Sequence, residues 1–209
     1  PEECWALDAQ LHVRGARKKL TAHYYGDKDG RKAIHSKEEV EALMKRLEGC
    51  EYEVRDVKLG ERVKKAPIPF TTSTLQQEAS KTLNFSTQKT MRLAQQLYEG
   101  VDIKGRGTIG LITYLRTDST RIAAEADAAA RSYIGDQFGA SYVSEAPAAA
   151  KSDAKIQDAH EAIRPTDITL TPVQVKEQLS RDQFRLYQLI WKRFTASRMR
   201  PAVYETTSV

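Results

Sequence analysis

The segment Ala66-Pro67-Ile68-Pro69 divides this sequence into two parts of different character. Each proline fixes its own φ angle, lacks an amide hydrogen and disfavours the helical region for the residue before it, so a helix cannot run through the segment. Lys64 and Lys65 precede it, as expected of an exposed linker. We therefore treat residues 1–68 as one structural unit and expect a new unit to begin at Pro69.

The first part favours strands. Residues 5–13 alternate between apolar and polar types, which is the pattern of a half-buried strand, and residues 20–24 repeat it. A capping-box pattern then starts a helix over residues 36–47, whose apolar side chains follow helical spacing. Extended structure returns at residues 52–59. The predicted order is β-β-α-β, and nothing in it resembles a reactive centre.

Composition is that of an ordinary globular protein. Of the 209 residues, 40% are hydrophobic and 29% are charged, which is typical of a soluble protein that buries a core. No apolar run approaches the length needed to cross a bilayer. Cys4 and Cys50 fit no metal-binding spacing and are too few for a disulfide framework, so we expect reduced, structural cysteines in a cytoplasmic protein. The chain starts with proline and not methionine, and we expect it to be a piece of a longer polypeptide.

The net charge of +5 is compatible with a polyanionic partner such as a nucleic acid. It is spread along the chain, because residues 1–67 carry 15 Lys and Arg against 13 Asp and Glu, and residues 68–209 carry 18 against 15. Neither part is a basic tail. Charge alone therefore does not identify a binding surface.

The second part opens with two predicted helices. Ser73 and Gln76 match the capping-box pattern of a helix that runs through Leu83, and a second helix covers residues 87–99. Two short helices joined by a tight turn are either a DNA-reading device or a plain αα-corner. Extended arms on either side of Lys104-Gly105-Arg106-Gly107 predict a hairpin after them.

The stretch that follows carries the densest group of reactive side chains. β-Branched residues and glycine at positions 107–109 favour an extended strand or hairpin arm over a helix. In a strand, Tyr114 and Arg116 point to the same side. A phenolate is a competent nucleophile and the planar guanidinium suits phosphate oxygens. The spacing by itself, however, favours a tyrosine packed on a sheet beside an exposed arginine. The neighbouring polar side chains are Thr113, Thr117, Asp118 and Ser119.

The remainder is predicted to be mainly helical. Asp118 and Ser119 are N-cap candidates for an alanine-rich helix over residues 122–133. Pro172 is well placed to open a last long helix. Residues 203–209 have the composition of a strand.

We expect this last strand to return to the sheet begun by residues 4–25. The predicted fold class is then α+β. A discontinuous β-rich domain covers residues 1–68 and 200–209, and a mainly helical, winged-helix-like domain is inserted at residues 69–199.

Three blocks of sequence carry a resemblance to a known family. They are Pro69-Phe-Thr-Thr-Ser-Thr-Leu-Gln-Gln-Glu-Ala79, the run Leu97-Tyr-Glu-Gly100 with Gly110-Leu-Ile-Thr-Tyr-Leu-Arg-Thr-Asp-Ser119, and Gln157-Asp-Ala-His-Glu-Ala-Ile-Arg-Pro-Thr166. Together, and in this order, they closely resemble the bacterial type IA DNA topoisomerases, and the second block resembles the active-site tyrosine motif of that family. The resemblance implies that the first domain is part of the arch and that the second carries the nucleophile.

The same resemblance implies a set of site residues. Tyr114 is the implied nucleophile, and Arg116 and His160 are the implied phosphate-binding side chains beside it. Although a lone histidine is more often structural, the block around His160 matches the family motif. The resemblance also implies DNA contacts by Gln95, Glu99, Thr113, Thr117, Asp118 and Arg164. Gln95 and Glu99 are also explained as solvated polar residues, and Arg164 as a brace for its own loop.

In the resembled enzymes the tyrosine attacks single-stranded DNA, becomes linked to the 5′ phosphate, and the released 3′-OH later reseals the break without ATP. Their Mg²⁺ is bound by acidic residues of a separate N-terminal domain, and no matching cluster of Asp and Glu occurs in this chain. We therefore expect no metal site and no cofactor here. We also expect this fragment to be inactive alone.

The implied partners are single-stranded and negatively supercoiled DNA and the remaining domains of the same polypeptide, with no membrane. We expect a monomeric fragment in the cytoplasm, associated with the nucleoid. Two other functions stay open from the sequence: a non-catalytic winged-helix DNA-binding module, and the topoisomerase half of a reverse gyrase.

Overall fold

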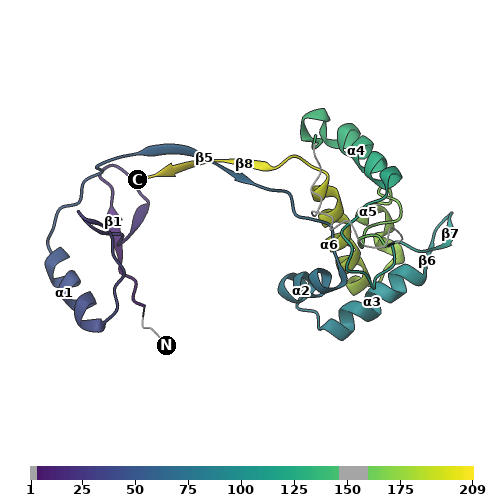
Figure 1. The fold of residues 1–209 in the computed structure, drawn as a ribbon, viewed down its shortest axis with the longest axis horizontal. Coiled ribbons are helices and arrows are strands. Elements are labelled where there is room, and N and C mark those ends of the chain that lie inside the picture. The colour runs from purple at the N-terminus through teal and green to yellow at the C-terminus, as the bar shows by residue number, and fades with distance from the viewer. Residues whose placement is uncertain (1–3, 146–159) are drawn as a thin grey trace. The chain divides into compact units, whose positions relative to one another are not determined.

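The computed structural model describes residues 4–145 and 160–209 (Figure 1). The chain divides into two compact units, one comprising residues up to Lys58 with Val209 and the other Leu59–Ser208. Helices are combined with two-stranded antiparallel pairings and a further pairing of β5 with β8, which confirms the α+β class. The domain limits at 68/69 and 199/200 stay a prediction. Residues 157–159 of the third sequence block lie outside the described residues.

The first unit is built from two hairpins and a helix. Its strands are β1 (Asp8–His12), β2 (Lys19–His23), β3 (Gly26–Asp27) and β4 (Gly30–Arg31). β1 pairs with β2, and β3 pairs with β4. The helix α1 (Lys37–Leu47) begins after Ser36, whose hydroxyl accepts a hydrogen bond from the Glu39 amide, so the predicted cap is confirmed. Within the described part of this unit, the buried apolar side chains are Ile34 and Val40.

The C-terminal strand does not pair as predicted. β8 (Ala202–Ser208) pairs with β5 (Lys58–Lys64) and not with the sheet of β1 and β2. Strand composition reveals an extended conformation but not the partner strand, because any exposed edge offers the same backbone groups. Residues 52–57, expected to be extended, contain no strand.

The second unit contains the main core. Its helices are α2 (Thr72–Leu83), α3 (Thr87–Glu99), α4 (Ala124–Phe138), α5 (Pro172–Val175) and α6 (Arg181–Ser197). Apolar side chains of α2, α3 and α6 form one cluster, in which Leu75, Leu97 and Leu186 are fully buried. Leu111, Ile112 and Leu115 belong to the same cluster, so the segment that carries Tyr114 rests directly on the core.

The helix pair and hairpin predicted at the start of this unit are present. α2 is capped by Thr71 and Thr74, and not by Ser73 and Gln76 as predicted. The left-handed conformation of Asn84 ends it. After α3, β6 (Val101–Ile103) and β7 (Gly107–Ile109) pair as an antiparallel hairpin. This arrangement fits the winged-helix-like prediction.

Two helix boundaries differ from the prediction. α4 begins at Ala124 without a side-chain cap, because the hydroxyl of Ser119 is bonded instead to the amide of Arg121. The expected long final helix is interrupted. α5 is followed by a short 3₁₀ turn (Lys176–Gln178), and α6 then starts anew with Ser180 and Gln183 in a reciprocal cap.

Candidate active site around Tyr114

The extended arm predicted at residues 107–109 is present as β7, but the segment from Gly110 to Ser119 is irregular backbone and not a strand. An isolated bridge joins Ile112 to Pro165 and bends follow. Successive residues of the segment nevertheless alternate between buried and exposed. Leu115, Thr117 and Ser119 are buried, whereas Tyr114, Arg116 and Asp118 are exposed. Tyr114 and Arg116 are therefore both open to solvent, as the alternation predicted.

The segment is joined at its start to the end of α3. The Leu111 amide donates to the Leu97 carbonyl over 2.7 Å. Gly110 lies so close to α3 that a Cβ atom on it would stand 2.6 Å from the Tyr98 carbonyl oxygen. A glycine is therefore required at this position, because a side chain would collide with backbone.

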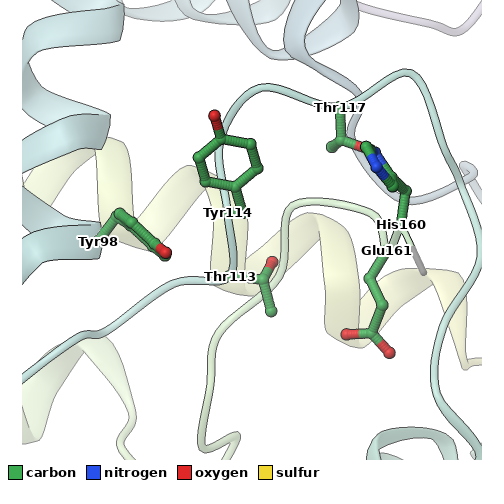
Figure 2. A pocket seen from close by; sticks show the side chains of 6 residues that line it. All are labelled: Tyr98, Thr113, Tyr114, Thr117, His160 and Glu161. Carbon is green, nitrogen blue, oxygen red and sulfur yellow. The ribbon is translucent and has the colours of Figure 1, made fainter.

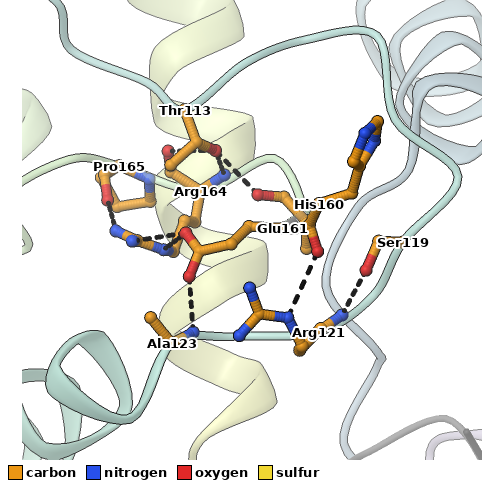
Figure 3. Close-up of polar contacts among 9 residues, drawn as sticks. Thr113, Ser119, Arg121, Ala123, His160, Glu161, Arg164 and Pro165 are labelled. Carbon is orange, nitrogen blue, oxygen red and sulfur yellow. Dashed lines mark hydrogen bonds and ion pairs between the residues drawn. The ribbon is translucent and has the colours of Figure 1, made fainter. Parts of the chain in front are cut away.

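Thr113 joins the segment to the third sequence block. Its hydroxyl donates to the Ala162 carbonyl over 2.7 Å and accepts from the Arg164 amide over 3.0 Å (Figure 3). Its own amide donates to the Arg164 carbonyl over 2.9 Å. Thr113 thus uses its hydroxyl within the protein, and residues 160–166 are held beside Tyr114.

A hollow of about 390 Å³ surrounds the Tyr114 ring. Its lining residues are Tyr98, Thr113, Tyr114, Thr117, His160 and Glu161. Tyr114 is 49% exposed, and Figure 2 shows its ring between Tyr98 and His160, with its hydroxyl directed away from Tyr98 and Thr113. The Tyr98 ring meets it edge-on, with centroids 5.5 Å apart and planes at 67°. The phenol is therefore contacted by Tyr98 on one side, and about half of the residue is open to solvent.

A second hollow of about 370 Å³ adjoins the first and shares Thr117 and His160 with it. Its other lining residues are Thr72, Ser73, Arg116 and Asp118. His160 thus lies where the space in front of Tyr114 meets the space in front of Arg116. A larger hollow of about 530 Å³ lies within the first unit and is lined by none of the predicted site residues.

The loop that carries His160 is braced by charged side chains. The Arg164 guanidinium donates to Glu161 over 2.7 Å and to the Pro165 carbonyl over 3.0 Å (Figure 3). The other Glu161 oxygen accepts from the Ala123 amide over 2.7 Å, and Arg121 donates to the His160 carbonyl over 3.3 Å. Arg164 and Glu161 are only 13% and 19% exposed. Bracing is the arrangement observed for Arg164, and its contact with DNA stays a prediction.

Gln95 and Glu99 lie on α3 but do not line either hollow. The Gln95 amide donates to the Glu99 carboxylate over 2.6 Å on the exposed surface. Between them, Tyr98 does line the first hollow. It is 40% exposed.

Several residues of the site escaped the sequence reasoning. They are Tyr98, Glu161, Thr72 and Ser73. Each stands in or beside a recognised sequence block, which was the available signal. Whether each of these side chains faces a hollow depends on how the helices and loops pack together, and the periodicity of the sequence does not predict that packing.

Across residues 4–145 and 160–209, no group of three or more His, Cys, Asp or Glu side chains is placed to hold a metal ion. The acidic Mg²⁺ site of the resembled family therefore does not fit the residues described. Over the same residues, none of the helices combines the length and apolar character that a membrane span requires.

Comparison with known proteins supports the resemblance. A family model described as DNA topoisomerase matches residues 1–209. The crystal structure of full-length topoisomerase I from Thermotoga maritima is 44% identical, with a TM-score of 0.70 over 90% of this chain. The chain spans 29% of the length of that protein. It therefore belongs to the DNA topoisomerase family, which confirms the resemblance to bacterial type IA enzymes carried by its three sequence blocks.

Proposed function

We propose that Tyr114 is the nucleophile of a type IA topoisomerase reaction on single-stranded DNA. The observation that carries this proposal is the half-exposed phenol in the hollow that His160 also lines. The adjoining hollow of Arg116 provides space for the neighbouring part of a sugar-phosphate chain. Family membership adds DNA as the partner.

The reaction exchanges one phosphodiester for another. The Tyr114 phenol loses its proton and its oxygen bonds to phosphorus, while the bond from phosphorus to the 3′ oxygen of the preceding nucleotide breaks. That oxygen leaves and takes up a proton, so the products are a 5′-phosphotyrosine and a free 3′-OH. Attack by the 3′-OH reverses each step. The number of phosphodiester bonds is conserved, so strand passage and relaxation of negative supercoils proceed without ATP.

Two side chains, Arg116 and His160, assist this exchange in the proposed mechanism. The planar Arg116 guanidinium suits phosphate oxygens and stabilises the charge that develops on them. The His160 ring donates a hydrogen bond to the same phosphate. Glu161 is unsuited to the role of base, because its carboxylate is engaged with Arg164 and the Ala123 amide and points away from the Tyr114 ring in Figure 2.

The remaining requirements are assigned to other parts of the polypeptide. We place the Mg²⁺ ligands in a domain outside this chain, since the described residues hold no acidic cluster. The chain on its own is then unable to relax DNA. Its partners are single-stranded and negatively supercoiled DNA and those other domains, in the cytoplasm at the nucleoid.

The test is the variant Tyr114→Phe in the full-length enzyme, incubated with Mg²⁺ and a labelled single-stranded oligonucleotide. We expect no covalent adduct and retained DNA binding, because only the attacking oxygen is removed. Tyr142→Phe is the matched control, since Tyr142 is 55% exposed in the same unit but lines neither hollow. An adduct trapped from Tyr114→Phe would refute the proposal.

A second candidate is a winged-helix DNA-binding module without catalysis. It is favoured by the order of α2, α3 and the β6–β7 hairpin, which is a known arrangement for duplex recognition. In that case Tyr114 stacks on a base and forms no bond to phosphorus. Sequence-selective duplex binding by the wild-type enzyme, with no phosphotyrosine adduct, would establish this candidate instead.

A further inference from the structure

Thr72 is the first residue of α2 and lines the hollow in front of Arg116. It is partly buried and belongs to the first sequence block. It stands 43 and 45 positions before Leu115 and Thr117, the two residues that flank Arg116. No role was assigned to it from the sequence.

The Thr72 hydroxyl bonds to the backbone on both sides of Arg116. It lies 2.7 Å from the Leu115 carbonyl oxygen and 3.0 Å from that of Thr117, so its single proton is donated to one or shared between them. It also accepts from the Thr117 amide over 2.9 Å. The Thr72 amide adds a bond of 2.9 Å to the Thr117 carbonyl. The two peptide groups around Arg116 are thus tied to one side chain.

The other end of this connection is rigid. α2 is capped by Thr71 and Thr74, whose side chains and amides bond reciprocally. Leu75 and Ala79 bury α2 in the core with no measurable exposure. Since the cap is made by Thr71, removing the Thr72 hydroxyl leaves the start of α2 capped.

The Arg116 side chain, in contrast, makes no polar contact of its own within the described residues. Among residues 4–145 and 160–209, its guanidinium has no hydrogen-bond or ion-pair partner. Its direction before DNA binds therefore depends on its backbone. A shift of about 1 Å in a substrate-positioning group lowers rates roughly a hundredfold.

We propose that Thr72 is a positioning residue for the DNA-cleavage reaction. Its hydroxyl fixes the backbone of Arg116, so that the Arg116 guanidinium meets the scissile phosphate beside Tyr114. This inference rests on the proposed function of Tyr114 and assigns a further residue to the same site. Thr72 does not itself touch the phosphate. It acts through Arg116.

The first experiment compares Thr72→Val with Thr72→Ser in the full-length enzyme. Valine keeps the shape and removes the hydroxyl, whereas serine retains it. We expect Thr72→Val to slow single-turnover adduct formation at saturating oligonucleotide by roughly tenfold to a hundredfold. Thr72→Ser should restore the rate to within about threefold of wild type, because the rate depends on the hydroxyl. An unchanged rate in Thr72→Val, or an equal loss in Thr72→Ser, overturns the proposal.

The matched control is Thr82→Val, at the opposite end of the same helix. Its hydroxyl donates to the Glu78 carbonyl over 2.7 Å and contacts neither hollow. We expect this variant to cleave at the wild-type rate. A loss equal to that of Thr72→Val would show a general effect on α2 and would overturn the assignment.

The second experiment asks whether Thr72 acts through Arg116. In an Arg116→Ala background, Thr72→Val should cause little further loss, because the side chain that it positions is absent. Losses that multiply would show that Thr72 acts independently of Arg116, which contradicts the proposal.

A readout without activity separates this inference from the proposed function. Hydrogen exchange at the Thr117 amide should accelerate in Thr72→Val and return to the wild-type rate in Thr72→Ser, because the hydroxyl is its acceptor. Unchanged exchange in Thr72→Val overturns the positioning role even where Tyr114 forms the adduct. The opposite outcome is also distinguishable. If the wild-type enzyme forms no Tyr114 adduct but Thr72→Val still accelerates exchange at the Thr117 amide, the proposed reaction is refuted and the contact between Thr72 and Thr117 stands.

Discussion

The two units differ in how their apolar side chains are used. In the second unit, the helices and the Tyr114 segment share one cluster in which Phe70, Leu97 and Leu115 are 0–1% exposed. In the first unit, Ile34 and Val40 are the buried apolar residues of the described part, and Tyr25 and Met44 are mostly exposed. Both units contain helices and paired strands, so secondary structure does not distinguish them. The depth of the core does.

This difference explains where the candidate site lies. A phenol and a guanidinium must be held to within a fraction of an ångström for attack on phosphorus, and close packing transmits that constraint to the backbone. The Tyr114 segment has core residues beneath it and threonine hydrogen bonds at both ends. The predicted site residues accordingly all lie in the second unit.

The largest effect is expected from removing a buried side chain from the core of each unit and comparing the losses in stability. Phe70→Ala removes a side chain that is fully buried and whose ring lies 4.3 Å from the Arg193 guanidinium carbon. We expect it to lower the free energy of unfolding of the second unit by about 3–5 kcal/mol. Val40→Ala in the first unit should cost only about 1–2 kcal/mol, because fewer methyl groups are lost. Chemical denaturation followed by hydrogen exchange in each unit measures both, and equal losses would contradict the difference in core depth.

Close packing beside the site is tested by glycine substitutions. Gly110→Ala places a methyl group against the Tyr98 carbonyl oxygen, so the backbone must move. We expect a loss of about 1–3 kcal/mol in stability and a slower adduct rate. Gly135→Ala, within α4, is the control, because the added Cβ meets only the Val143 side chain at 3.8 Å. We expect this substitution to stabilise the protein by about 0.5–1 kcal/mol. Thermal denaturation of both variants measures these changes in stability. An unchanged stability in Gly110→Ala would show that residue 110 is not tightly packed against α3.

A smaller effect is expected from the ring beside the nucleophile. Tyr98→Ala removes the edge-on contact with Tyr114, which is worth about 0.5–1.5 kcal/mol beyond the buried area. We expect single-turnover adduct formation to slow by roughly threefold to tenfold, since about 1.4 kcal/mol corresponds to a factor of ten in rate. Tyr98→Phe keeps the ring and should cleave normally. A loss of DNA affinity without any change in rate at saturating DNA would instead make Tyr98 a base-stacking residue.

The smallest effect concerns the β6–β7 hairpin of the second unit. Arg106 at its turn donates to Asp167 over 3.1 Å. Burial tends to raise the pKa of Asp167, but hydrogen bonds from Thr169 and the contact with Arg106 outweigh it, so the pKa lies below its ordinary value of 3.8. A lowered carboxyl pKa contributes stability above the ordinary pKa, and that contribution is lost as the pH falls through the folded value.

We therefore expect acid to loosen the hairpin only below about pH 4, with less than about 1 kcal/mol at stake because the pair is solvent-screened. Asp167→Asn should remove this pH dependence. Hydrogen exchange at the hairpin amides between pH 3 and pH 6, corrected for intrinsic exchange, measures it. A hairpin that loosens equally in both proteins would have another acid-sensitive contact.

Local structure was largely predictable from the sequence. The helices α1 and α3 and the β6–β7 hairpin appear where capping residues, apolar spacing and glycines indicated, and α2 is present although its predicted cap was wrong. The break at Leu179 and Ser180 was missed, because a new cap inside an apolar pattern was outweighed by the continuity of that pattern. The three sequence blocks also brought Tyr114, Arg116 and His160 to attention before any geometry was known.

What the sequence by itself determined is local: which segments are helical, which side of each is apolar, and which residues carry reactive groups. Tertiary structure alone decided that β8 pairs with β5, that Tyr98 faces the hollow and that Thr72 holds the backbone of Arg116. The physical reason is separation along the chain. Periodicity reports the geometry of neighbours three or four residues apart, whereas the hydroxyl of Thr72 meets a backbone 45 positions away, where only the packing of the helices on the core brings the two together.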